Sequence, residues 1–299
     1  LLLFPLFIQA QDVPIGFWKD YLSYNSASYI AEADNRIYCV TSGSLFYIDK
    51  DDNTINRMSK VIGLSDVGVK HVAYSEELKI TVITYENCNI DLIKNNQIIN
   101  ISDIKRKEIT GLKSINNITV ESGIAYLSTT FGLVLVDLEK EEIKDTYSVG
   151  SQIDNLIING CAFLGDSIIV ATINGMYFAE ANNPNLADYY NWTLYHDSYL
   201  TYDNVISYNG YTDIDHYTEI ISLSYNNNTL IRTKFDAIGI NKDDGTYAEL
   251  TYSKFENIKY AWIDNEAIIW VADSVNGLLK FSNYEYQGSY IPEGPARND

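Results

Sequence analysis

The sequence has few cysteines, and none is placed where a bridge or a metal site would need it. Its 299 residues include only three, Cys39, Cys88 and Cys161, and they are widely spaced. An odd, sparse set fits neither a disulfide framework nor a zinc-ligand pattern. We therefore expect three small buried side chains rather than a bridge.

Positive charge is scarce, and the motifs of common catalytic and cofactor sites are missing. Lys and Arg number 21 against 40 Asp and Glu, which gives a net charge of −19 and makes nucleic acid a poor partner. The one basic run, Lys105, Arg106 and Lys107, is a candidate anion-binding patch, or alternatively a solvated loop between strands. No HExxH, G-x-S-x-G or phosphate-binding glycine loop is present, so we predict no catalytic residue, no metal and no cofactor.

No apolar run is long enough to span a bilayer. The short run Leu1 to Ile8 is followed by the small residue Ala10 and then by a polar segment, without an initial Met. This pattern predicts that residues 1–10 are the remnant of a secretory signal peptide and that the protein is exported. An N-terminal edge strand is the alternative.

Tyrosine and β-branched residues are abundant, whereas helical periodicity is absent. The chain has 25 Tyr and 5 Pro, and Ile, Val, Thr and Tyr dominate its alternating segments. These residues favour strands. The composition and the alternation together predict an all-β protein.

A hairpin pattern recurs along the chain with nearly constant period. Each copy has two alternating strands around a short turn, and the isoleucines at matching positions of successive copies lie 43 to 52 residues apart. The copies are Arg36 to Asp49, Lys79 to Ile93, Ile124 to Leu138, Ser167 to Ala181, a weaker Thr218 to Thr233, and Ala267 to Phe281.

Further strand patterns flank each hairpin, so each repeat is expected to be a blade of four antiparallel strands. Such a sheet must bury both faces against its neighbours, which predicts a β-propeller over residues 11–290. Six repeats are visible, and the ring has six or seven blades. Asn191 to Phe255 is expected to hold the fifth blade with an insertion. Phe17 to Tyr24 could close the ring by pairing with the last blade, or residues beyond Asp299 could complete a seventh.

One acid stands inside an apolar strand pattern, in "NCNIDLIKNN". Alternation places Ile90 and Leu92 on one face of this strand and Asp91 on the other, beside the turn. There the carboxylate can accept backbone N–H groups, and this structural role is favoured over a catalytic one.

Several motifs between Trp18 and Ile93 resemble a known family. "FWKDYLSYNSASYIAEADNRIYCVTSGSLFYIDKD", "MSKVIGLSDVGVKHVAY" and "TYENCNIDLI" are similar to the N-terminal propellers of the PorZ family of the Bacteroidetes type IX secretion system. The residues that carry this resemblance, with an expected structural role, are Trp18, Gly63, Leu64, Asp66, Tyr85, Asn87 and Asp91. Cys88 departs from the pattern, because the family tends to have Gly there. The closing "YIPEGPARND" resembles the segment after this propeller, so residues 291–299 are expected to begin a linker to a further domain.

The resemblance implies a non-enzymatic adaptor in the attachment complex of that system, in the periplasm or on the outer-membrane surface. Its implied partners are other attachment-complex proteins, including a sortase-like protease, and anionic lipopolysaccharide, which cargo proteins receive. Two alternatives remain open at this point. One is the periplasmic sensor of a hybrid two-component regulator, whose repeats "IIWVADSVNGLLKF" also fits. The other is a carbohydrate-active enzyme on a propeller scaffold.

Overall fold

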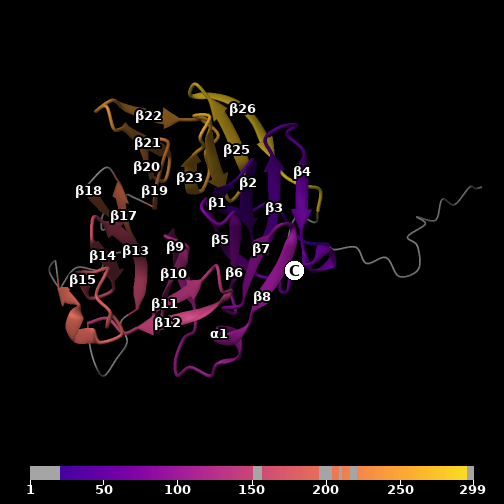
Figure 1. Cartoon of the computed structure of the whole chain (residues 1–299). Helices are drawn as coiled ribbons and strands as arrows, with labels where there is room; N and C mark the ends of the chain where they lie inside the picture. The colour runs from indigo at the N-terminus through magenta and orange to yellow at the C-terminus, as the bar shows by residue number, and fades with distance from the viewer. Residues whose placement is uncertain (1–20, 151–156, 195–203, 209–210, 216–220, 295–299) are drawn as a thin grey trace, which may run out of the picture.

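The computed structural model shows sheets arranged around a central axis (Figure 1). It describes residues 21–150, 157–194, 204–208, 211–215 and 221–294. Six sheets have four antiparallel strands each, joined in sequence order. The all-β, β-propeller prediction is therefore confirmed.

The six four-stranded sheets are built from consecutive strands, as follows. The first three are β1 (Ala27–Ala33), β2 (Arg36–Thr41), β3 (Ser44–Asp49) and β4 (Ile55–Met58); β5 (Val69–Ser75), β6 (Ile80–Tyr85), β7 (Ile90–Lys94) and β8 (Gln97–Ile101); and β9 (Ile115–Glu121), β10 (Ile124–Thr129), β11 (Gly132–Asp137) and β12 (Glu142–Tyr147). The others are β13 (Ile158–Leu164), β14 (Ser167–Thr172), β15 (Gly175–Glu180) and β16 (Thr193–Leu194); β19 (Ser222–Asn226), β20 (Thr229–Thr233), β21 (Ala237–Lys242) and β22 (Tyr247–Thr251); and β23 (Ile258–Ile263), β24 (Ile269–Asp273), β25 (Gly277–Ser282) and β26 (Glu285–Tyr290). Helical turns are confined to connections: η1 (Lys60–Ile62), α1 (Asp103–Arg106) and η2 (Tyr189–Asn191).

A seventh, two-stranded sheet stands between the fourth and fifth four-stranded sheets. It consists of β17 (Asn204–Tyr208) and β18 (Tyr211–Asp215), and β17 contacts both β13 and β19. The insertion expected between Asn191 and Phe255 therefore supplies a seventh position of the ring.

The ring closes without strand exchange in the described part of the chain. β1 lies against β23 and β24, and all four strands of the last sheet come from residues 258–290. One of the two alternatives was that the segment Phe17 to Tyr24 pairs with the last sheet. Residues 21–26 form no strand, so the described part of this segment does not pair in that way. Instead the fully buried Tyr24 packs in one cluster with Trp270 and Leu278.

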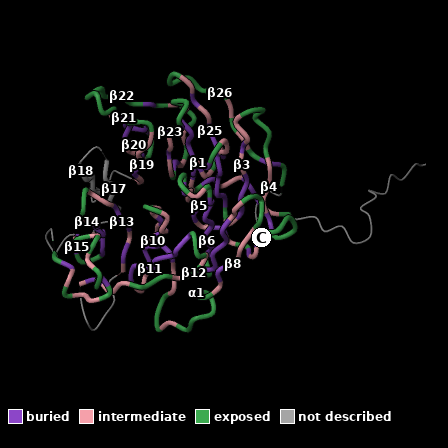
Figure 2. The backbone as a smooth tube through the Cα atoms, in the orientation of Figure 1, coloured by how far each residue is buried: buried purple, intermediate pink, exposed green. Residues whose placement is uncertain are grey.

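The core lies between neighbouring sheets, which explains why both faces of the middle strands are apolar. All six residues of β6 and all six of β11 are buried. Ile80 and Val82 of one sheet share a cluster with Leu127 and Val134 of the next. Burial therefore follows the strands, whereas exposed residues gather in the hairpin loops (Figure 2).

Five innermost strands share a bulge near their first residue. The residues that the strand register skips are Ser28, Lys70, Asn116, Asn159 and Lys259. Two of these side chains bridge to the next blade: Lys70 Nζ lies 2.6 Å from Ser114 Oγ, and Asn116 Nδ2 lies 2.9 Å from the carbonyl of Ile158. The bulge thus re-aims a polar side chain toward the adjacent inner strand.

Candidate functional site

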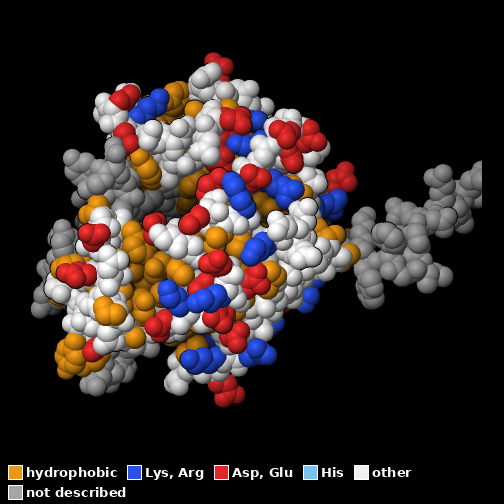
Figure 3. Space-filling model, in the orientation of Figure 1, with side chains coloured by type: hydrophobic (Ala, Val, Ile, Leu, Met, Phe, Trp, Pro, Cys, Tyr) orange, Lys and Arg blue, Asp and Glu red, His pale blue; other side chains and the backbone are white. Residues whose placement is uncertain are grey.

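The innermost strands surround a central cavity of about 800 Å³. They run in the same direction, since the ends of β19, β23 and β1 meet: Asn226 Nδ2 donates to the carbonyl of Ile263 (3.0 Å) and to Glu32 (3.2 Å). Their carboxyl ends therefore form one mouth of the channel. The acids that line the channel at this mouth are Glu32, Asp34, Glu76 and Glu121. Figure 3 shows the hollow in the visible face, with acidic side chains on its rim.

Inside the channel three rings from three blades meet. Tyr29 lies edge-on to His71 at a centroid distance of 5.3 Å and against Tyr260 at 4.6 Å. Burial, followed by the charge of Lys70, lowers the pKa of His71 to about 3, and burial raises the pKa of Tyr29 to about 12. Burial thus favours the neutral form of both side chains at physiological pH.

The seam where the first and last blades meet is held by a buried acid at the channel mouth. Glu32 Oε1 lies 2.8 Å from Lys50 Nζ, and the two side chains are only 6% and 9% exposed. The same carboxylate accepts from Asn226 Nδ2 (3.2 Å) and faces Trp262 Nε1 (3.5 Å). Burial opposes the charge of Lys50, but the hydrogen bond and the charge of Glu32 outweigh it, so the pKa of Lys50 is raised.

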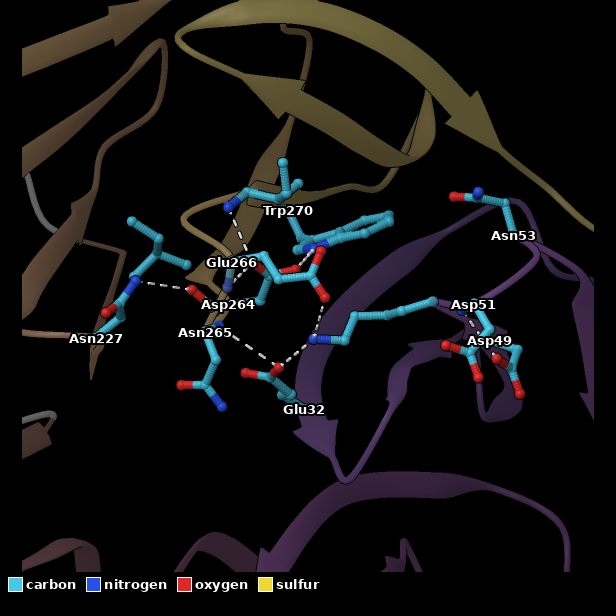
Figure 4. A network of polar contacts seen from close by, with 12 residues as sticks. Glu32, Asp49, Asp51, Asn53, Asn227, Asp264, Asn265, Glu266 and Trp270 are labelled. Carbon is cyan, nitrogen blue, oxygen red and sulfur yellow. Dashed lines mark hydrogen bonds and ion pairs between the residues drawn. The ribbon is translucent and has the colours of Figure 1, made fainter.

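A second buried acid orders the last blade next to this seam (Figure 4). Asp264 is fully buried and accepts from Trp270 Nε1 and from the backbone N–H groups of Glu266 and Ile268, each at 2.9 Å. Glu266 in turn lies 3.3 Å from Lys50. Hence one network joins the β23–β24 turn to the first blade.

The acid singled out in the second repeat ties a linker to its blade. Asp91 is fully buried and accepts from the Ser65 backbone N–H (2.8 Å), from the Tyr85 hydroxyl (2.6 Å) and from Asn100 Nδ2 (2.8 Å). Burial, then the neighbouring carboxylate, raises the pKa of Tyr85, which keeps it a donor. The arrangement is structural, with every Asp91 oxygen engaged.

Asp66 forms the centre of an adjacent network. Its Oδ2 accepts from Asn87 Nδ2 (2.6 Å) and from Lys105 Nζ (2.5 Å), while its Oδ1 accepts from the Val67 N–H (3.1 Å). Burial opposes ionisation, but these donors outweigh it and lower the pKa of Asp66 to about 2. The carboxylate is therefore charged throughout the physiological range.

The structure brings six of the seven motif residues into one corner, between the first and second blades. Besides the two acids and their partners Tyr85 and Asn87, Gly63 ends η1 in a left-handed conformation (φ 117°) and Leu64 is buried at 4% exposed. The seventh, Trp18, and the expected signal-peptide residues 1–10 lie outside the described residues.

The candidate anion-binding residues lie on and after α1, beside this corner. Lys105 is paired with Asp66, and Arg106 Nη2 lies 3.5 Å from Asp103. The backbone carbonyl of Lys107 accepts from Lys113 Nζ (3.1 Å). Two of the three bases thus already face a carboxylate of the chain.

All three cysteines are free and buried, as expected. Burial raises the pKa of each thiol. Cys88 stands out because its φ is 62°, a left-handed conformation that favours glycine. Its backbone therefore keeps the shape for which the family tends to use Gly.

Two kinds of feature are absent from the residues that the structure describes. No group of three or more His, Cys, Asp or Glu is arranged there to hold a metal ion. None of the described helices is long and apolar enough to cross a membrane.

Sequence reasoning did not find the seam. Glu32 and Lys50 stand in ordinary strand and turn positions, and their contacts with Asn226 and Glu266 join residues about 200 positions apart. A local signal existed only for Asp264, since an Asp whose carboxylate accepts N–H groups two residues later is a common turn former.

Comparisons with known proteins agree with the fold and point to one family. The model of the PorZ N-terminal β-propeller domain of the type IX secretion system matches residues 37–193. No curated protein matches. Among solved structures, PorZ of Porphyromonas gingivalis, described as an essential bacterial surface component of the type IX secretion system, has a TM-score of 0.78 at 20% identity, over 95% of this chain and 41% of that one.

Two other solved structures are more distant. The WD40 β-propeller domain of Doa1 has a TM-score of 0.61 at 10% identity, over 89% of this chain and 98% of that one. The extracellular domain of the putative one-component system BT4673 from B. thetaiotaomicron has a TM-score of 0.48 at 11% identity, over 88% and 41%. At these identities the matches to PorZ and Doa1 establish the fold alone, and this chain spans less than half of the solved PorZ chain.

Proposed function

The chain belongs to the family of PorZ N-terminal β-propeller domains, and from this membership we propose that it is a non-enzymatic adaptor in the attachment complex of a type IX secretion system. The family match carries the proposal. It spans residues 37–193 and so includes the corner built around Asp66 and Asp91.

The chemistry of the channel supports binding rather than catalysis. The ionisable rings in its wall, His71 and Tyr29, are held neutral by burial, and Glu32 at the mouth is paired with Lys50. A general acid or base needs a pKa near the working pH and access to substrate. A rigid ring with exposed loops on both ends suits an adaptor instead.

The proposed partners are other attachment-complex proteins, including a sortase-like protease, with the chain exported to the periplasm or the outer-membrane surface. Anionic lipopolysaccharide is proposed as the acceptor that the complex serves. A net charge of −19 disfavours general contact between this propeller and an anionic glycolipid. Contact through this part of the protein would have to use Lys105, Arg106 and Lys107.

The proposal is tested by deleting the gene in the organism that encodes it. We expect cargo proteins to keep their sorting domains and to be lost from the cell surface, with both restored by the full-length gene. Immunoblots of cargo size and surface labelling of intact cells give the two readouts. Unchanged processing and attachment in the deletion strain would reject the adaptor role.

A further inference from the structure

Two linkers between blades meet on the same side of the propeller. One runs from η1 to β5 and the other from α1 to β9. Lys105 Nζ of the second lies 2.5 Å from Asp66 Oδ2 of the first, and Lys113 Nζ donates to the carbonyl of Lys105 (2.8 Å). We call the exposed side chains of Val61, Ile62, Val67 and Leu112, with Lys60, Lys105, Arg106 and Lys107, the linker patch.

The aliphatic members of the linker patch are unusually exposed for their type. Val61 is 47% exposed, Ile62 58%, Val67 55% and Leu112 75%. Scattered exposed aliphatics are ordinary, but these four lie on two linkers that contact each other through Lys105 and Asp66, and exposed apolar side chains concentrated in one region are typical of interaction sites. In Figure 2 the linker that follows α1 is exposed.

Hydrogen bonds fix the backbone of both linkers, although these aliphatic side chains are exposed to water. η1 is closed by the Leu64 N–H, which donates to the Ser59 carbonyl (3.1 Å), and Leu64 itself is buried. Asp66 accepts the Val67 N–H, and Thr130 Oγ1 donates to the Leu112 carbonyl (2.5 Å). A partner that binds here therefore does not have to order the loops first, which saves affinity.

The charge of the linker patch differs from that of the chain. The two linkers carry five basic residues, Lys60, Lys105, Arg106, Lys107 and Lys113, against three acids, Asp66, Asp103 and Glu108, in a protein of net charge −19. Lys and Arg side chains occupy the place of α1 in Figure 3. An aliphatic centre with charged neighbours is the composition of a protein interface core and its rim.

We propose that the linker patch is a docking surface for a partner protein, through a segment in which aliphatic side chains are flanked by Asp or Glu. The aliphatic residues of the partner segment would pack on the four exposed aliphatic side chains, and its acids would pair with the basic residues around them. A lipid phosphate layer fits less well, because Asp66 and Asp103 already hold Lys105 and Arg106 and leave little free positive charge for a dense anionic surface, whereas a segment with one or two acids needs only one or two of the basic side chains.

The place of this contact in the cell rests on the proposed function, and photo-crosslinking in the native organism tests it. A photoreactive phenylalanine replaces Leu112 in the full-length protein, and the same residue replaces Tyr247 on β22 as a control of comparable exposure (56%). We expect a protein adduct from position 112 and not from 247, with mass spectrometry mapping it to an acidic, aliphatic segment of an exported protein. Adducts confined to lipid or to the chain itself, or equal adducts at both positions, would overturn the proposal.

Binding is then measured with a synthetic peptide of the mapped segment and the purified full-length protein. The double variant Ile62→Asp, Leu112→Asp is expected to bind the peptide at least tenfold more weakly. Ile55→Asp, the same substitution at an exposed isoleucine on β4, is expected to leave the affinity unchanged. A peptide with its acids changed to Lys should bind the Lys105→Glu, Lys107→Glu variant better than the parent protein. Equal binding to all variants would reject the surface.

The two proposals fail separately. If the deletion strain loses cargo attachment but the Ile62→Asp, Leu112→Asp gene restores it fully at normal protein level, the adaptor role stands and the linker patch is not its docking surface.

Discussion

Glu32 and Lys50 form an ion pair of 2.8 Å in which both side chains are nearly out of water, at 6% and 9% exposed. The pair belongs to the first blade, but its other partners, Asn226 and Glu266, come from the last two. Because no strand is exchanged between the described first and last sheets, side-chain contacts of this kind hold the ring shut.

Lys50→Met should therefore destabilise the propeller strongly. It leaves Glu32 buried without its cation, and breaking a buried pair costs about 3 kcal/mol or more. The free energy of unfolding in urea measures the loss. Lys94→Met is the matched control, because its pair with Glu141 (3.4 Å) is 37% and 31% exposed and should contribute less than about 1 kcal/mol.

The double variant Glu32→Gln, Lys50→Met tests whether the unpaired charge of Glu32 causes this loss of stability. Removing both charges should recover most of the stability lost in Lys50→Met, because the cost arises from the unpaired charge. A double variant as unstable as the single one would show that packing, not charge, holds this seam.

Asp91→Ala should lower the free energy of unfolding by about 3 kcal/mol, because it leaves the donors of Ser65, Tyr85 and Asn100 without their acceptor in the core. Thermal unfolding followed by circular dichroism gives the comparison. Asp52→Ala, in the exposed β3–β4 loop, is the control and should leave the stability nearly unchanged. A small effect of Asp91→Ala would mean that the corner is not held by this carboxylate.

Cys88→Gly should be more stable than Cys88→Ala by about 0.5–1 kcal/mol. Both variants lose the buried thiol, but only glycine relieves the left-handed backbone at φ 62°. At a normal strand position the order is reversed, so the comparison is diagnostic. Denaturant unfolding of the two variants side by side decides it, and an Ala variant of equal or higher stability would contradict the strain.

Local patterns predicted much of this fold, for a physical reason. Strand alternation and turn residues act over a few positions, so the repeats from Arg36 to Asp49 and from Lys79 to Ile93 were visible in the sequence and became β2–β3 and β6–β7. The motif residues around Asp66 and Asp91 also lie within one repeat and its linker. Their meeting follows from chain proximity.

Other features depend on distant parts of the chain and left no local signal. The pair of Glu32 with Asn226 exists only once the ring has closed. The two-stranded sheet comes from a stretch without clear repeat spacing, and its place is defined by contacts of β17 with β13 and β19. The inner-strand bulge at Lys70 comes after the first residue of β5, so too few alternating positions precede it for a break in the alternation to be visible.

His71 should make the propeller less stable in mild acid. Its folded pKa of about 3 lies below the usual 6.5, because burial and the charge of Lys70 oppose protonation beside Tyr29 and Thr84. Between these two values the unfolded chain binds a proton that the folded chain refuses. The contribution of neutral His71 to the free energy of unfolding is therefore fully present above about pH 6.5, and it is lost as the pH falls below that value.

We expect this histidine to lower the free energy of unfolding by about 2 kcal/mol when the pH falls from 7.5 to 5. The measurement is the free energy of unfolding at both pH values for the parent and for His71→Gln, since subtracting the two pH changes removes the contributions of all other groups. The variant should lose less stability on acidification, and the two proteins should respond alike between pH 7.5 and 8.5. A variant with the same loss as the parent would show that His71 takes up its proton within the folded ring, and therefore that the channel admits water and charge at this position.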